Sequence, residues 1–152
     1  MSHWYCLVLL LFLGSCAGPT SSLVVKPFKM VDYDIDNSSD PMVRGEKQRR
    51  LFGAVSPSER QERLGAYYTI LWSDPKGVGS GEGEVLFEYQ QGATASKIKR
   101  LTRRFGSGEA SGRVEFAIIG ADYRLNGRVL AWQTTLSRGG RVIAQERSHL
   151  WQ

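Results

Sequence analysis

Apolar and polar residues alternate through most of the second half of the chain, with the period of two that is typical of β-strands. Val85, Phe87 and Tyr89 fall on one face of such a segment, and polar residues fill the positions between them. Turn-forming residues separate these segments at intervals of about ten residues. The pattern predicts strands over Tyr67–Trp72, Glu84–Gln90, Lys97–Phe105, Arg113–Ile119, Tyr123–Leu125, Arg128–Ser137 and Arg141–Trp151. Lys97–Phe105 also has helical spacing, but we interpret it as a bulged strand because it lies between strands.

Two glycine-containing turns predict hairpins near the end of the sequence. Asn126-Gly127 is the dipeptide favoured in two-residue type I′ turns, and Gly139-Gly140 can adopt the same geometry. A two-residue turn at the second site fixes the pairing of the strands on either side of it. The expected pairs are Arg138 with Arg141, Leu136 with Ile143, Trp132 with Arg147, and Leu130 with His149.

Residues typical of helix starts and caps occur before residue 65. Ser56, Pro57 and Glu59 form a capping box with proline at the first helical position, which predicts a short helix over Pro57–Leu64. We expect a second short helix over Glu46–Phe52, and Asp40-Pro41 also resembles a helix start. Residues 41–64 are therefore predicted to form a short helical basic segment.

The residues before this segment are mostly polar and acidic, so we predict that residues 16–40 form a flexible tether. Asp32, Asp34 and Asp36 have part of the spacing of a calcium loop. Asn37 and Val43 occupy the positions where that motif needs Gly and Glu, so a solvated acidic linker is the better interpretation.

These elements predict an all-β fold, an antiparallel β-sandwich over residues 65–152 preceded by the tether and one or two short helices. The segment resembles an immunoglobulin-like or fibronectin type III sandwich in length and strand spacing, but it lacks the Cys…Trp…Cys pattern of antibody domains. A small open barrel is the alternative. Trp72, Trp132 and Trp151 are expected to anchor the core.

The first residues of the chain change the picture of where the protein resides. The apolar run from Trp4 to Leu13 is too short to span a bilayer and fits the middle of a signal peptide. Leu13-Gly14-Ser15-Cys16 resembles the lipobox of bacterial lipoproteins. The resemblance implies that residues 1–15 are a signal peptide, that Cys16 is the lipid attachment site, and that the chain is anchored in the cell envelope. The residue after Cys16 is Ala17 rather than Asp, and in this the chain resembles the outer-membrane-bound class of these lipoproteins. The resemblance implies an outer-membrane protein that faces the periplasm.

An ordinary signal peptide cut after Ala17 is the alternative, because Ser15-Cys16-Ala17 also satisfies the small-x-small rule. Cys16 would then leave with the signal, and the product would be secreted in soluble form.

The charge is moderately basic, with 20 Lys and Arg against 15 Asp and Glu and a net charge of +5 over the 152 residues. Two basic clusters are candidate contacts for an anionic ligand, but ordinary solubility is the favoured explanation of them. Their members are Arg44, Lys47, Arg49, Arg50, Lys97, Lys99, Arg100, Arg103 and Arg104.

Few residue types suited to catalysis remain once the signal is removed. His149 is then the only histidine and Cys16 carries lipid, which argues against Cys-His catalysis and His- or Cys-ligated metals. We expect no catalytic residues, metal or cofactor. The leading hypothesis is a non-catalytic, lipid-anchored envelope protein whose sandwich docks on a protein partner. A binder of anionic polymer or lipid head groups is the alternative, a hydrolase using His149 is a third hypothesis, and nucleic acid is a poor partner for an exported chain.

Overall fold

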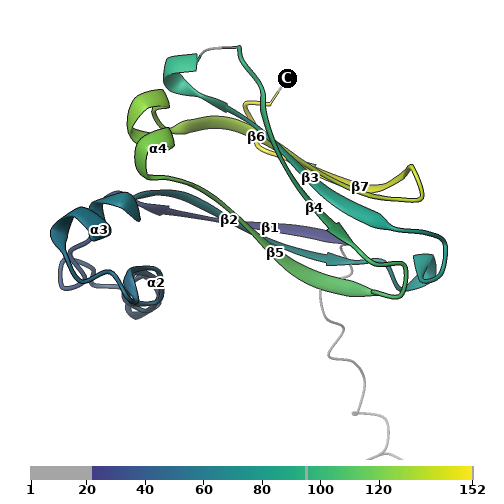
Figure 1. Cartoon of the computed structure of the whole chain (residues 1–152), viewed down its shortest axis with the longest axis horizontal. Helices are drawn as coiled ribbons and strands as arrows, with labels where there is room; N and C mark the ends of the chain where they lie inside the picture. Colours follow the sequence, from purple (N-terminus) through teal and green to yellow (C-terminus); the bar gives the residue numbers. More distant parts are fainter. Residues whose placement is uncertain (1–21, 95, 152) are drawn as a thin grey trace, which may run out of the picture.

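The computed structural model describes residues 22–94 and 96–151, and within them most of the chain is β-structure. The predicted signal peptide 1–15, Cys16 and the first part of the predicted tether lie outside the described residues. Seven strands form two antiparallel sheets that face each other (Figure 1). The strands are β1 Leu23–Met30, β2 Gly65–Ser73, β3 Gly83–Gln91, β4 Lys99–Phe105, β5 Ser111–Ile119, β6 Val129–Arg138 and β7 Arg141–Arg147.

The smaller sheet has the strand order β1-β2-β5, and the larger one has the order β4-β3-β6-β7. The predicted β-sandwich architecture is therefore confirmed. Inward-facing side chains of both sheets form one core, in which the Phe87 ring packs against Tyr68, Tyr89 and Phe116. Trp72 is part of this core as predicted, and Trp132 packs against it while partly exposed.

Three short helices and two turns of 3-10 helix connect the strands. Helix α2 follows the Asp40 cap, and α3 begins with the predicted capping box, in which Ser56 and Glu59 bond each other's backbone N–H groups. Helix α2 is longer than the predicted Glu46–Phe52, and α3 ends two residues before the predicted Leu64. The bounds are α2 Pro41–Leu51, α3 Pro57–Glu62, α4 Gly120–Asn126, η2 Pro75–Gly77 and η3 Gly92–Thr94.

The predicted tether is wrong from Leu23 onward, because Leu23–Met30 is strand β1 of the smaller sheet. Leu23 and Val25 point into the core between the sheets, and Met30 packs under α2 with Leu51. The acidic stretch that follows is also held, since Lys47 Nζ donates to Asp32 Oδ1 over 2.6 Å. The sandwich therefore begins near residue 23 rather than at residue 65.

The Asn126-Gly127 hairpin and the Tyr123–Leu125 strand are also wrong. Strands β5 and β6 belong to different sheets, so the chain crosses between them through α4 instead of turning back on itself. Gly120 starts this helix at φ +60°, and Gly127 ends it at φ +78° with its N–H bonded to the Tyr123 carbonyl.

The Gly139-Gly140 hairpin is confirmed, but its predicted register holds only beside the turn. Arg138 pairs with Arg141 and Ser137 with Val142, after which an irregularity between Leu136 and Ser137 shifts the ladder by one residue. Arg147 consequently lies opposite Gln133 rather than Trp132. Leu136 pairs with Ala144 rather than Ile143, and β7 ends at Arg147, before His149 could face Leu130.

Candidate functional site

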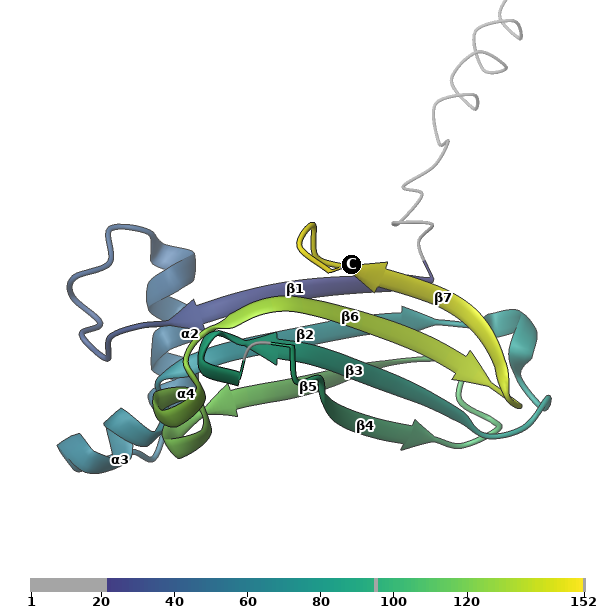
Figure 2. The same cartoon turned by 90° about the horizontal axis from the view of Figure 1, so that it is seen from above.

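The two long sides of the sandwich differ in how they are closed. Seen from above, β1 and β7 run along one side and β4 and β5 along the other (Figure 2). On the first side the Val25 N–H donates to Glu146 Oε2 over 3.0 Å, and Pro27 interrupts the outer edge of β1. On the second side no further strand pairs with β4 or β5 among the described residues, so alternate backbone groups of both strands face outward.

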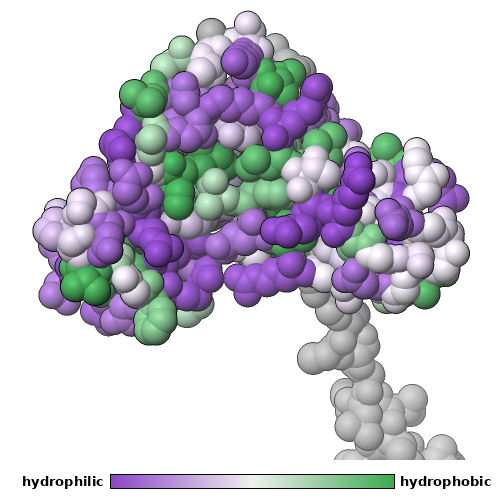
Figure 3. Space-filling model, in the orientation of Figure 1, coloured by the Kyte–Doolittle hydropathy of each residue, from purple (hydrophilic) through white to green (hydrophobic). Residues whose placement is uncertain are grey.

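We call the hollow on this second side the β4–β5 opening. Figure 3 views it face on and shows an apolar strip between the sheets, bordered by hydrophilic side chains. Part of it is a cavity of about 270 Å³, floored by the Trp72 and Phe105 rings, which stack with centroids 3.9 Å apart. The cavity is lined by Trp72, Arg103, Arg104, Phe105, Glu109, Gly112, Arg113, Val114 and Glu115.

Strand β4 carries most of the second basic cluster to the rim of this opening, but its cations differ in their contacts. Lys99 bonds Gln91 Oε1 and Asp122 Oδ1, and Arg100 pairs with Glu88 over 2.8 Å. Arg104 is 3.8 Å from Glu84 and largely exposed. The Arg103 side chain is exposed and forms no ion pair or hydrogen bond with any described residue, and the same is true of the Lys97 side chain before the strand. Arg103 is therefore the cation of this rim best placed to receive an anion.

The first basic cluster is mostly turned inward. Lys47 is buried and donates to Asp32 Oδ1 and to the Asp34 carbonyl. Arg50 is 3% exposed and lies between the Tyr67 and Phe28 rings, 3.7 and 5.2 Å from their centroids. Both cations already have internal partners, so we do not retain them as ligand contacts.

Arg49 pairs with Glu46 and Glu115 while half exposed, and Arg44 is exposed on α2 without a partner among the described residues. The side chains of these two residues remain available to solvent.

Glu115 links α2 to the sheet. Arg50 Nη1 and Nη2 donate to its two carboxylate oxygens over 3.0 and 3.1 Å, and the Thr69 hydroxyl donates to Oε2. Burial by itself raises the pKa of Glu115, but the hydrogen bonds from Arg50 and Arg49 outweigh it, so the pKa lies below its ordinary value. The carboxylate thus stabilises the fold above its unfolded-state pKa of about 4.3.

Replacing Glu115 with Gln is expected to lower the free energy of unfolding by about 2 kcal/mol at neutral pH, because Arg50 stays buried without its carboxylate. The wild-type advantage should shrink as the pH falls through the lowered pKa of Glu115, since the protonated acid resembles Gln. Urea unfolding at neutral and strongly acid pH measures this. Glu82→Gln, at an exposed position, is the matched control, and a difference that persists in acid would contradict the assignment.

Arg138 is also a buried cation, and it lies at the end of the sandwich where β1 begins. The Arg138 side chain is 1% exposed and donates from Nε to Asp74 Oδ2 over 2.8 Å. Its Nη1 donates to the Gly81 and Ser107 carbonyls, and its Nη2 to the Glu109 carbonyl. One guanidinium therefore holds the β2–β3 and β4–β5 loops to the end of β6, which is a structural role.

A groove on the smaller sheet was not predicted from the sequence. We call it the α2 groove, a hollow of about 350 Å³ between α2 and the outer face of this sheet. Lys26 and Arg113 are exposed at this groove, and their side chains form no ion pair or hydrogen bond with any described residue. Its lining residues are Lys26, Pro27, Phe28, Met42, Glu46, Arg50, Thr69, Leu71 and Arg113.

No arrangement of acid, base and nucleophile emerges from these contacts. His149 lies exposed beyond the end of β7, away from both hollows. Burial raises the pKa of Tyr68 and of Tyr89 to about 12, so both phenols stay protonated at neutral pH. Among residues 22–94 and 96–151, no group of three His, Cys, Asp or Glu side chains is placed to hold a metal ion. The same residues include no helix of the length and apolarity needed to cross a bilayer.

Comparison of the chain with protein-family models, curated proteins and solved structures found no match.

Proposed function

We propose that the chain is a non-catalytic, lipid-anchored protein of the bacterial cell envelope whose β-sandwich docks a protein partner at the β4–β5 opening. The observation that carries the proposal is the asymmetry of the sandwich. Among the described residues, β1, β4, β5 and β7 are all edge strands, but the Val25–Glu146 hydrogen bond joins β1 to β7, whereas a cavity with apolar rings and the unpaired Arg103 side chain lies between β4 and β5.

We further propose an immunoglobulin-like type for this sandwich, in agreement with the resemblance drawn from strand spacing. In constant-type immunoglobulin domains, the first, second, fifth and fourth strands share one sheet, and the third, sixth and seventh share the other. The order β1-β2-β5 and β4-β3-β6-β7 supports this type. Only β4 departs from it, lying at the edge of the second sheet instead of the first.

The lipid anchor is proposed at Cys16 from the lipobox-like Leu13-Gly14-Ser15-Cys16. Attachment through two or three acyl chains is stable, because each buried methylene contributes about 0.8 kcal/mol. We propose the outer membrane, facing the periplasm, as the location.

The occupant that best fits the opening is an extended segment of an envelope protein with acidic and apolar side chains. Such a segment can pair with the outward-facing backbone of β5, which contains no proline over nine residues. Its apolar side chains would cover the ring floor at Trp72 and Phe105, and its carboxylates would pair with Arg103 and Arg104.

Crosslinking in living cells tests this docking site. A photoreactive amino acid at position 103 should yield a discrete protein adduct, because the Arg103 side chain lines the cavity. The same amino acid at Thr102, the exposed neighbour on the opposite face of β4, is the matched control and should yield little or none.

Equal adducts from positions 102 and 103, or none from position 103, would contradict the proposed site. The alternative function, binding of an anionic polymer or lipid head groups through the exposed arginines, predicts a different behaviour with salt. Electrostatic binding should collapse between low and physiological ionic strength, whereas docking through an apolar floor should survive it.

A further inference from the structure

Among the described residues, helices cover only one end of the outer face of the β1-β2-β5 sheet. Helix α2 packs over the end that holds Met30 and Tyr67, and Figure 1 shows none of the described helices beneath the other end of this sheet. At that uncovered end, Leu71 lies between Val24 and Arg113 in the strand register, and Lys26 lies beside Thr69 in the neighbouring row. Leu71 and Val24 are only partly buried there.

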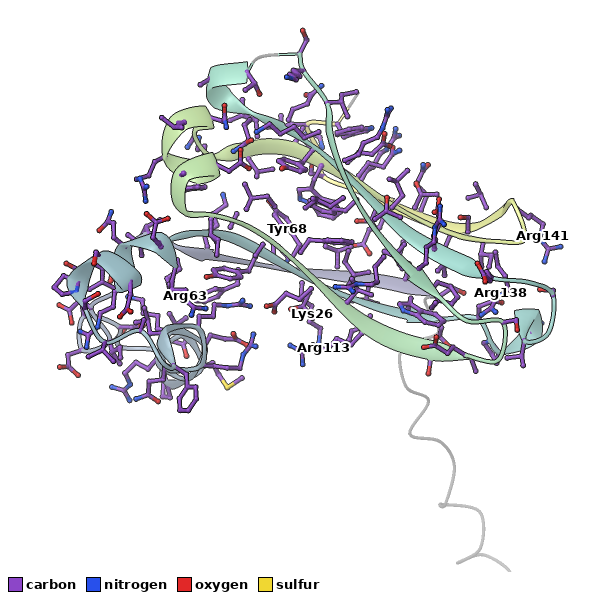
Figure 4. All side chains as sticks on the ribbon, in the orientation of Figure 1. Lys26, Arg63, Tyr68, Arg113, Arg138 and Arg141 are labelled. Atoms are coloured by element: carbon purple, nitrogen blue, oxygen red, sulfur yellow. The ribbon has the colours of Figure 1, made fainter. Side chains whose placement is uncertain are left out.

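The charges of this uncovered half are unbalanced. The Lys26 and Arg113 side chains project from the same side of the sheet (Figure 4). Neither side chain forms an ion pair or hydrogen bond with a described residue. The nearby acids are already engaged, since Glu115 bonds Arg49, Arg50 and Thr69, and Glu46 lies against Arg49 and Arg50. Two free cations beside an apolar floor fit an anionic group attached to an apolar body.

Exposed apolar side chains stand on the same side of the sheet. Met42 lines the α2 groove and is 79% exposed, and Phe52, which caps the end of α2, is 86% exposed. Large apolar groups this exposed, close to unpaired cations, are typical of surfaces that meet a membrane interface.

The length of chain before β1 indicates what this surface faces. Six residues, 17–22, separate Cys16 from Leu23, and a chain of this length spans at most about 25 Å. Lys26 is three residues into β1, about 10 Å from Leu23. A lipid on Cys16 would therefore hold the uncovered half of this sheet within reach of the head groups.

We propose that the uncovered half of this sheet face, together with α2, rests on the anionic phospholipid head groups of the membrane that carries the anchor. Lys26 and Arg113 contact phosphates, and Met42 and Phe52 enter the interface. The inference rests on the proposed anchor at Cys16. Arg113 lines both hollows, so the membrane face meets one border of the β4–β5 opening and leaves its Arg103 rim and its Trp72 and Phe105 floor to the protein partner.

The test uses the complete chain, expressed with its own N-terminal segment, purified in its acylated form and reconstituted into vesicles that contain phosphatidylglycerol. A fluorophore on Met42→Cys reports the proposed membrane face, and one on Thr102→Cys reports the outer face of the other sheet. Head-group nitroxide lipids should quench the fluorophore at position 42 several-fold more than that at position 102, and high salt should reduce the difference.

Lys26→Gln with Arg113→Gln should lower the ratio of docked to undocked domain by about 30-fold, since each cation near an anionic surface contributes about five- to sixfold. Arg141→Gln with Lys97→Gln removes the same charge elsewhere and should leave the quenching unchanged. Equal quenching at positions 42 and 102, or no effect of the Lys26 and Arg113 changes, overturns the inference while the anchor stands. A purified chain whose mass shows no acyl groups overturns the anchor and the inference together.

Discussion

Replacement of Arg138 by alanine is expected to lower the free energy of unfolding by about 3–5 kcal/mol. The change leaves Asp74 buried without its cation and removes the donors of the Gly81, Ser107 and Glu109 carbonyls. It also removes the guanidinium from over the Phe105 ring, whose centroid lies 4.9 Å away. Urea unfolding followed by tryptophan fluorescence measures the loss, because Trp72 stacks on Phe105 in the same core.

Arg141→Ala is the matched control, at the other end of the same tight turn. Arg141 is exposed and pairs with no described side chain, so its loss should change the stability by less than about 0.5 kcal/mol. Arg138→Lys keeps the charge but not the planar fork, and should recover only part of the stability. A loss below about 1 kcal/mol in Arg138→Ala would show that the β2–β3 and β4–β5 loops are held by other contacts.

Replacement of Cys16 by serine is expected to abolish the mature, lipid-anchored form of the protein. A serine cannot form the thioether that carries the diacylglycerol, and a chain without acyl groups loses the anchoring energy of two or three buried chains. Fractionation of cells followed by immunoblotting measures the distribution. We expect the wild type in the membrane pellet and the variant either soluble or retained as an unprocessed precursor.

Cys6→Ser is the control for this change, because Cys6 lies inside the proposed signal peptide and should not affect the distribution. A Cys16→Ser variant that stays in the pellet at the length of the mature wild type would contradict the anchor. Washing the pellet in high salt distinguishes that outcome from weak attachment through Lys26 and Arg113, which salt should remove.

The part of the fold that the sequence predicted is the part fixed by local signals. Alternation located β3 and β5, because their buried positions recur with a period of two. Aromatic and β-branched residues located β2, and turn residues on either side located β6. The Ser56-Glu59 capping box and the Gly139-Gly140 turn were also predicted, since each depends on residues only a few positions apart.

Strand β1 was missed because Lys26, Pro27 and Lys29 interrupt its apolar pattern. These residues suit an edge strand, whose outer side needs no partner, but in the sequence they resemble a solvated linker. Helix α4 was missed because Asn126-Gly127 favours a hairpin locally. Whether such a turn ends a helix or joins two strands depends on whether its neighbours share a sheet, which no local pattern specifies.

The candidate sites were harder to predict than the fold, because the availability of a cation depends on its distant partners. Arg50 and Arg44 look alike in the sequence, yet Arg50 is buried against Glu115, sixty-five residues away, while Arg44 stays exposed. Lys26 lay in the predicted tether and Arg113 at the start of a predicted strand. Only the pairing of both strands with β2 brings these two cations to one face.

The most direct test of the whole account is the intact mass of the chain extracted from bacterial membranes. The account predicts a polypeptide that begins at Cys16 and carries the added mass of a diacylglyceryl group and an amide-linked acyl chain. An unmodified chain that begins at Gly18, or a full-length chain recovered without lipid from the cytosol, would contradict the anchor and the envelope function built on it.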